Sequence, residues 1–149
     1  MPTNILRNRA DKITTRDAKR PARVDGVRRV VIKAGRVAVR AELLDTATAD
    51  RIWAALPLHS TAETWGQSIN FEVPIESGRE RGARVNAAAG EIYYASEDDR
   101  VIIAFGPTPI SRGTEIRLPR PCNVWAKTED DVSLLKCVTP GEKVSMTAA

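Results

Sequence analysis

Apolar and polar side chains alternate along short segments of this chain, and this period of two is the feature that most constrains its fold. Residues 37–43 read VAVRAEL and residues 68–73 read SINFEV, so hydrophobic side chains recur at every second position. Successive side chains of a β-strand point to opposite faces, and a strand with one buried face therefore has this pattern. The chain is expected to be mainly β.

Glycine-containing turns join these segments into hairpins. Residues 30–32 are apolar and run into Lys33-Ala34-Gly35 before residues 37–43 return. Residues 60–65 and 68–74 flank Gly66-Gln67, a two-residue loop with glycine first, which is typical of a type II′ turn. Both pairs are therefore expected to be β-hairpins.

Further strands and two short helices complete the expected architecture. Thr46 or Thr48 can cap a helix near residues 47–56, which Pro57 ends. Thr128 and Asp131 resemble a capping box that opens a second helix, residues 129–136. The other strands are expected at 91–95, 101–105, 122–127 and around Val144 and Met146. At least seven strands and two short helices predict a β-barrel with helices at its ends.

Two segments depart from the alternating pattern. Residues 101–105 read VIIAF, which is typical of a strand buried on both faces. Residues 75–90 form a polar connection with three glycines, and a connection of this length is uncommon unless it is functional or mobile. Tyr93 and Tyr94 are neighbours in a strand and must face opposite sides, so one is expected in the core and the other in a groove.

The charge of the chain is unevenly distributed. Twelve Lys/Arg against three Asp make residues 1–40 basic, whereas eleven Lys/Arg against sixteen Asp/Glu make the remainder acidic. Residues 1–25 carry few apolar side chains and are expected to be a basic, flexible tail that folding does not need. The tail has no aromatic residue for base stacking, so nucleic acid is not an expected partner. Residues 26–149 are expected to form one folded domain.

Several chemistries lack the residues that they need. No apolar run reaches the roughly 18 residues that span a bilayer, and no secretory signal is visible, so the expected location is the cytoplasm. Cys122 and Cys137 fit no metal-ligand spacing and are expected to be small buried side chains. His59 is the only histidine and is interpreted as a surface residue. We therefore expect no metal, no cofactor and no catalytic triad.

Three short motifs carry a resemblance to a known family. They are Thr64-Trp65-Gly66, Phe105-Gly106-Pro107-Thr108-Pro109 and Asn123-Val124. In combination, over about residues 27–147, the chain resembles a bacterial and archaeal family of small cyclophilin-like proteins whose function is uncharacterised. The resemblance implies a closed cyclophilin-like β-barrel of about eight strands.

The resemblance does not extend to the residues with which cyclophilins isomerise prolyl bonds. Cyclophilins present an arginine with a neighbouring glutamine, an aromatic pocket floor, and a tryptophan and a histidine before a late strand. Here the histidine position holds Cys122 or Pro121. The tryptophan position holds Arg117 or Leu118, and no arginine with a following glutamine occurs around residues 68–74. We therefore expect negligible isomerase activity.

Two classes of function are left open. The preferred interpretation is a non-catalytic binding module that holds a small molecule or an extended peptide in a groove beside the barrel. The alternative is an enzyme on the same fold, either a peptidyl-prolyl isomerase or one of another chemistry. Neither the ligand nor the oligomeric state is indicated by the sequence.

Three features marked by glycine or proline suggest where a ligand would bind: Thr64-Trp65-Gly66, the loop around Gly90 to Tyr93, and residues 106–111. Turns rich in glycine and proline hold side chains in place and so limit the entropy lost on binding. Trp65 would supply a flat apolar wall with an indole donor, and Thr108 and Ser111 would supply hydroxyl groups. Tyr93 and Phe105 complete the expected site. The hypothesis requires Trp65, Tyr93 and Thr108 to line one concave surface.

Overall fold

The computed structural model describes residues 26–149, and the expected tail, residues 1–25, lies outside the described residues. Within the described residues the chain is mainly β, as expected, with one α-helix, α2 (Ala47–Ala55), and one 3-10 helix, η1 (Val132–Cys137). The ten strands of this part are β1 (Arg29–Ala34), β2 (Val37–Leu43), β3 (Leu58–Thr61), β4 (Glu63–Thr64), β5 (Ser68–Glu72), β6 (Arg84–Ala87), β7 (Glu91–Ala95), β8 (Arg100–Ala104), β9 (Ile116–Lys127) and β10 (Lys143–Ala148).

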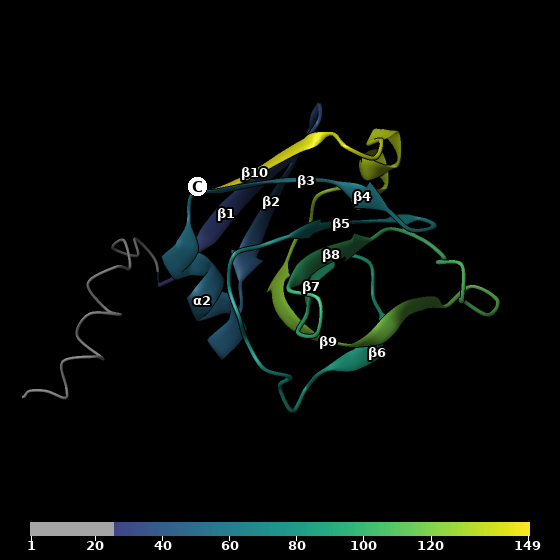
Figure 1. Cartoon of the computed structure of the whole chain (residues 1–149), viewed down its shortest axis with the longest axis horizontal. Coiled ribbons are helices and arrows are strands. Elements are labelled where there is room, and N and C mark those ends of the chain that lie inside the picture. Colours follow the sequence, from purple (N-terminus) through teal and green to yellow (C-terminus); the bar gives the residue numbers. More distant parts are fainter. Residues whose placement is uncertain (1–25) are drawn as a thin grey trace, which may run out of the picture.

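The strands pair antiparallel around a nearly closed barrel (Figure 1). Their order is β3-β10-β1-β2-β9-β7-β8-β5-β4, and β6 lies off this path and pairs with β9. Only Ala62 separates β3 from β4 in the chain, so one interrupted strand pairs with β10 on one side and with β5 on the other. With β3 and β4 counted together, eight strands of the described chain surround the core, which confirms the expected cyclophilin-like barrel.

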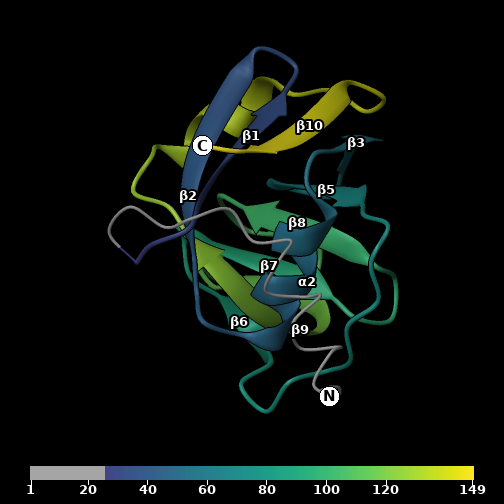
Figure 2. The same ribbon diagram turned by 90° about the vertical axis from the view of Figure 1, so that its left-hand side faces the viewer.

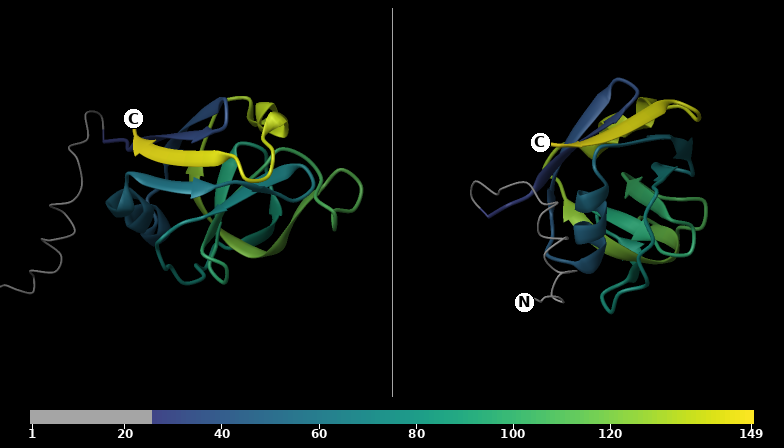
Figure 3. Two further views of the ribbon diagram at one scale, coloured as in Figure 1. Left: turned by 45° about the horizontal axis from the view of Figure 1, so that its top comes forward. Right: turned by 60° about the vertical axis from the view of Figure 1, so that its left-hand side comes forward.

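The interior of the barrel is an apolar core built from the inward faces of these strands. Trp125, Tyr94 and Phe71 are among its largest side chains, and each is fully buried. α2 covers one end of the barrel, where Ile52 and Trp53 join the core (Figure 2). Figure 3 shows the same helix at the barrel end from two further directions. Each large side chain buried in this way stabilises the fold by roughly 1.5–3 kcal/mol.

The two helices differ in how well the sequence predicts them. α2 begins as expected, because the Thr46 side chain accepts a hydrogen bond of 3.1 Å from the Ala49 amide. The second helix is shorter than the expected 129–136 and is a 3-10 helix capped by Asp131, whose side chain accepts from the Ser133 amide. The expectation that Thr128 caps it is wrong, because the helix begins only at Val132; the Thr128 hydroxyl accepts from the Asp130 amide ahead of the helix and donates to the Arg40 carbonyl on β2.

The polar connection over residues 75–90 is held by buried hydrogen bonds. The Asn123 amide donates to the Gly78 carbonyl and to the Thr48 hydroxyl, and its oxygen accepts from the Glu80 amide at 2.8 Å. The Glu80 carboxylate accepts in turn from the Thr48 backbone amide at the start of α2. Since buried polar groups need partners, this network joins the connection to the helix and to β9.

The two cysteines differ in exposure. Cys122 is buried, as expected, whereas Cys137 is exposed, so that part of the expectation is wrong. Cys137 ends η1, and only Val132 and Leu135 of that helix turn toward the core. The apolar neighbours of Cys137 in the sequence therefore do not bury it.

Candidate functional site

The sheet formed by β5, β8 and β7 has two faces with different surroundings. Ile69, Phe71 and Ile103 point into the barrel core. In the pairing register, Asn70 lies opposite Ile102, and Ile102 lies opposite Tyr93, so these three side chains share the outer face. The first half of β9, together with β6, covers part of that face (Figure 1).

A small second core fills the covered part of the outer face. It consists of Tyr93, Ala95, Ile102, Leu118 and Cys122. The Tyr93 hydroxyl accepts from the Ala88 amide at 2.9 Å and donates to Glu91 at 2.6 Å. Burial raises the pKa of Tyr93 and raises the pKa of Cys122 to about 12, so both groups are protonated at neutral pH.

A groove opens where this second core ends. Its volume is about 320 Å³. Ile102 and Ala95 of the second core form its floor, and Trp65 and Pro119 are its apolar walls. The remaining lining residues are polar: Thr64, Ser68, Asn70, Asp98 and Arg100. An apolar concave surface with a few polar groups at its edge is the usual form of a small-molecule site.

Trp65 is held in place by the tight turn between β4 and β5. The Trp65 amide donates to the Ser68 carbonyl at 3.1 Å, and the Ser68 hydroxyl donates back to the Trp65 carbonyl at 2.6 Å. Gly66 follows with φ +59°, which glycine adopts without strain. A Cβ at Gly66 would also lie 2.7 Å from the Pro109 ring, so the turn packs directly on the Pro107–Pro109 loop.

The polar edge of the groove includes one guanidinium group. Arg100 donates to the Asn70 side-chain oxygen across the β5–β8 pair, at 2.9 Å. Both side chains are partly exposed and line the groove. Sequence reasoning missed both of them. The alternation at 68–73 does place Asn70 on the outer face. Arg100 lies just before the VIIAF run, which includes Ile102 and was assigned to a strand buried on both faces, so no groove was expected beside it.

The structure brings only one of the five expected site residues to the groove. Trp65 lines it, whereas Tyr93 belongs to the second core and is fully buried. Tyr94 is also fully buried, so the expectation that one of the two tyrosines faces a groove is wrong. Phe105 is half-buried and packs against the main core. Trp65, Tyr93 and Thr108 therefore do not line one concave surface.

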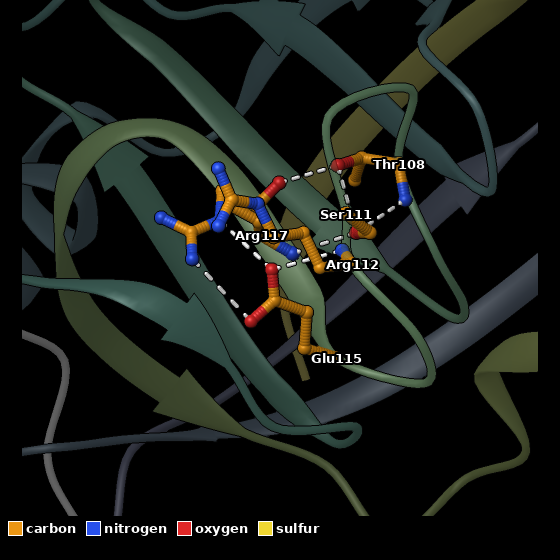
Figure 4. A network of polar contacts seen from close by, with 5 residues as sticks. All are labelled: Thr108, Ser111, Arg112, Glu115 and Arg117. Carbon is orange, nitrogen blue, oxygen red and sulfur yellow. Dashed lines mark hydrogen bonds and ion pairs between the residues drawn. The ribbon is translucent and has the colours of Figure 1, made fainter.

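Thr108 and Ser111 use their hydroxyl groups within their own loop (Figure 4). The Ser111 oxygen accepts from the Thr108 and Arg117 amides, at 2.9 and 3.0 Å, and the Thr108 hydroxyl donates to the Arg117 carbonyl. Glu115 accepts from the Arg112 amide and from the Arg117 side chain. These bonds give the loop its shape, and the two hydroxyls expected to bind a ligand contact Arg117 instead.

A larger and more polar cavity lies between β2, β7 and the end of β9. Its volume is about 610 Å³, and Gly90, from the loop before Tyr93, lines it. The charged lining residues are Arg29, Arg40, Lys127, Glu42, Glu91, Glu129 and Asp130. Its uncharged lining consists of small residues and one threonine, without a large apolar wall. The smaller groove is therefore the better candidate for a small-molecule site.

Residues 26–149 contain neither a metal-binding cluster nor a membrane-spanning helix. No group of three or more His, Cys, Asp or Glu side chains in this range could hold a metal ion. In the same range, no helix is long and apolar enough to cross a membrane. His59 lies exposed on β3, apart from the groove-lining residues.

The eight-stranded barrel with a groove on its outer face defines a domain of the cyclophilin type. The family model described as Cyclophilin-like matches residues 28–147, so the chain belongs to this family. It is similar to the solution structure of the hypothetical protein AF2241 from Archaeoglobus fulgidus, with 28% sequence identity and a TM-score of 0.71. That similarity covers 83% of this chain and 95% of the archaeal one.

A second solved structure shares the fold at lower sequence identity. It is the structure of McbB in complex with tryptophan, with 12% identity and a TM-score of 0.59. The match covers 79% of this chain but only 44% of McbB, so it shows the barrel fold alone. No protein with a curated description matches the chain significantly.

Proposed function

We propose that this protein is a non-catalytic binding module that holds a small molecule in the groove beside Trp65. The observation that supports the proposal is the composition of the groove, with an apolar floor from Ile102 and Ala95, a tryptophan wall and polar groups at one edge. Its volume of about 320 Å³ is at the lower end of the range for small-molecule sites. The ligand is therefore expected to be small.

An extended peptide is the other occupant considered, and the groove favours it less. A peptide that adds to a sheet needs a free strand edge along several residues. The strand nearest to Trp65 is β4, which has only two residues and already pairs with β5. A peptide could place one apolar side chain against Trp65, but this strand offers it little backbone pairing.

Binding of aromatic fragments tests the proposal. Small aromatic compounds, added at millimolar concentration to the ¹⁵N-labelled full chain, should shift the amide resonances of β5 and β8. Trp65→Ala should weaken this binding about tenfold, equivalent to roughly 1.4 kcal/mol, because it removes the flat wall. Leu134→Ala is the matched control, since Leu134 is a large exposed side chain on η1 outside the groove. Shifts that are absent, or that persist in Trp65→Ala, contradict the proposal.

One observation favours prolyl isomerisation as a second candidate. An isomerase needs a guanidinium aimed at the prolyl amide within an apolar pocket, and Arg100 stands at the edge of the apolar groove. The uncatalysed barrier is about 18–20 kcal/mol, so an active protein would accelerate a proline-peptide assay measurably. We expect no acceleration above the uncatalysed rate. Acceleration that disappears in Arg100→Gln would instead identify the groove as an isomerase site.

A further inference from the structure

The groove beside Trp65 is lined by an arginine, Arg100, that forms no ion pair within residues 26–149. Arg100 is partly buried there, and its hydrogen-bond partner, the Asn70 side-chain oxygen, is neutral. Glu72 lies opposite Arg100 in the β5–β8 register. No ion pair forms between them, and Arg100 has none with any other acid in the part of the chain that the structure describes.

Two acidic residues near the groove, Glu97 and Asp98, are close to other arginines. Glu97 forms ion pairs with Arg79, at 2.9 Å, and with Arg120. Asp98, which lines the groove, lies 3.7 Å from Arg120. Two carboxylates therefore face two guanidinium groups in this cluster, and their charges cancel. Of the two charged residues that line the groove, Asp98 has a neighbouring arginine, whereas Arg100 has no ion-pair partner within residues 26–149 and faces the exposed Glu72 across the strand pair.

Asn70 adds a second donor beside Arg100. Its oxygen is occupied by the arginine, so its NH₂ group is directed away from that bond. No hydrogen bond of this NH₂ group is found within residues 26–149. The groove edge thus presents a guanidinium and an amide donor next to the apolar floor formed by Ile102. A carboxylate accepts from both kinds of donor, and an arginine can bind it through two parallel bonds.

We infer that the ligand of the groove is a small molecule with an apolar, ring-sized body and a carboxylate group. The body packs between Trp65 and Pro119 over Ile102, and the carboxylate accepts from Arg100 and Asn70. This inference rests on the proposed binding function and adds the chemical class of the ligand. A neutral or cationic ligand of the same shape leaves Arg100 without an ion-pair partner and binds less tightly.

A matched pair of fragments tests the inference. Phenylacetate and phenylacetamide share an aromatic body, and they differ in the carboxylate that replaces a neutral amide. Titration of the full chain, followed by the amide resonances of β5 and β8, should show at least about tenfold tighter binding of phenylacetate. The preference should decrease as the salt concentration rises, because ions screen the partly exposed charge.

Three variants locate the preference at Arg100. Asn70→Asp keeps the shape of the side chain but places a carboxylate on the arginine, so it should abolish the preference for phenylacetate. Arg100→Gln should also abolish the preference for phenylacetate. Arg100→Lys should retain part of the preference, because lysine keeps the positive charge but lacks the planar, two-pronged guanidinium group. Arg36→Gln is the matched control, because Arg36 is exposed in the β1–β2 turn outside the groove. Thermal melting of each variant confirms that it is folded.

The possible outcomes distinguish the inferred ligand class from the proposed binding function. A preference for phenylacetate that Asn70→Asp removes and Arg36→Gln leaves intact supports the inference. Equal binding of the two fragments, or a preference that persists in Asn70→Asp, overturns the inference but leaves the binding function standing. If neither fragment shifts the resonances of β5 and β8, the inference and the proposed function both fail.

Discussion

Ile103 and Ile102 are neighbours on β8, yet they belong to two different regions of the molecule. Ile103 packs inside the closed barrel, whereas Ile102 belongs to the small second core and also forms the floor of the groove. Tyr94 and Tyr93 on β7 divide between the two regions in the same way. The inner face is enclosed by the whole barrel, and the outer face is covered by part of β9 and by β6. The candidate site lies where this partial cover ends.

Because the two regions differ in this way, substitutions on the inner face should change the stability of the fold, and substitutions on the outer face should also change the proposed binding. Side chains of the inner face have no access to solvent, so a change there acts on folding alone. On the outer face, the same strands supply the apolar floor and the polar edge of a groove of about 320 Å³. Paired substitutions, one on each face, therefore test whether the two regions are as independent as their packing indicates.

The largest expected difference is between Ile103→Ala and Ile102→Ala. Ile103→Ala should lower the free energy of unfolding by about 3–4 kcal/mol, because the cavity that it leaves is closed on all sides. Ile102→Ala should cost about 1–2 kcal/mol, since the space that it leaves joins the groove. Urea denaturation of both variants measures the two values. Equal losses would show that the second core contributes as much to stability as the barrel core.

The next comparison is between two asparagines. Asn123→Ala should lower the free energy of unfolding by about 2–3 kcal/mol, because it removes three buried hydrogen bonds and leaves their partners unsatisfied. Asn70→Ala should cost less than about 1 kcal/mol, since water can replace its bond to Arg100 at the groove edge. Hydrogen exchange should also show lost protection at Ser77 and Glu80 in Asn123→Ala alone. A similar cost at both positions would contradict the assignment of Asn70 to an open site.

The smallest expected effect concerns the two thiols at high pH. Burial raises the pKa of Cys122 from 9.0 to about 12, so between these values the unfolded chain loses a proton that the folded chain keeps. The contribution of Cys122 is fully present below the unfolded pKa of 9 and decreases as the pH rises above it, on the order of 1 kcal/mol per pH unit. Cys122→Ala should therefore flatten the fall in stability above pH 9, and the exposed Cys137→Ala should not. Identical slopes in the two variants would mean that the second core opens to solvent.

Local patterns predicted most of the fold but little of the site. The alternation at 37–43 and the glycine at Gly35 predicted the first hairpin, because strand pairing and turn geometry depend on residues close in sequence. Thr128 was misassigned because Asp131, three residues later, caps the helix, while the Thr128 hydroxyl donates to Arg40, a partner 88 residues away that no local pattern reveals.

The site depends on long-range pairing to a greater extent. Arg100 and Asn70 are 30 positions apart, and only the β5–β8 register brings them together. Trp65 was predicted to line the candidate site, and it lines the groove, because a tight glycine turn next to it fixes its position locally. Thr108 was assigned to a ligand because its residue type suits a binding site, but its hydroxyl closes its own loop through the Arg117 carbonyl.

The pairing of β1 with β10 also determines how this domain can be joined to other proteins. Val30 lies directly opposite Ala148, so the two ends of the folded domain are adjacent strands. The C-terminus in Figure 1 lies on the side of α2, across the barrel from the β4–β5 hairpin that carries Trp65. Neighbouring ends allow a domain to be inserted into a host loop through short linkers. A fusion or a surface attachment through the end of β10 would therefore join the domain on the side away from the β4–β5 hairpin.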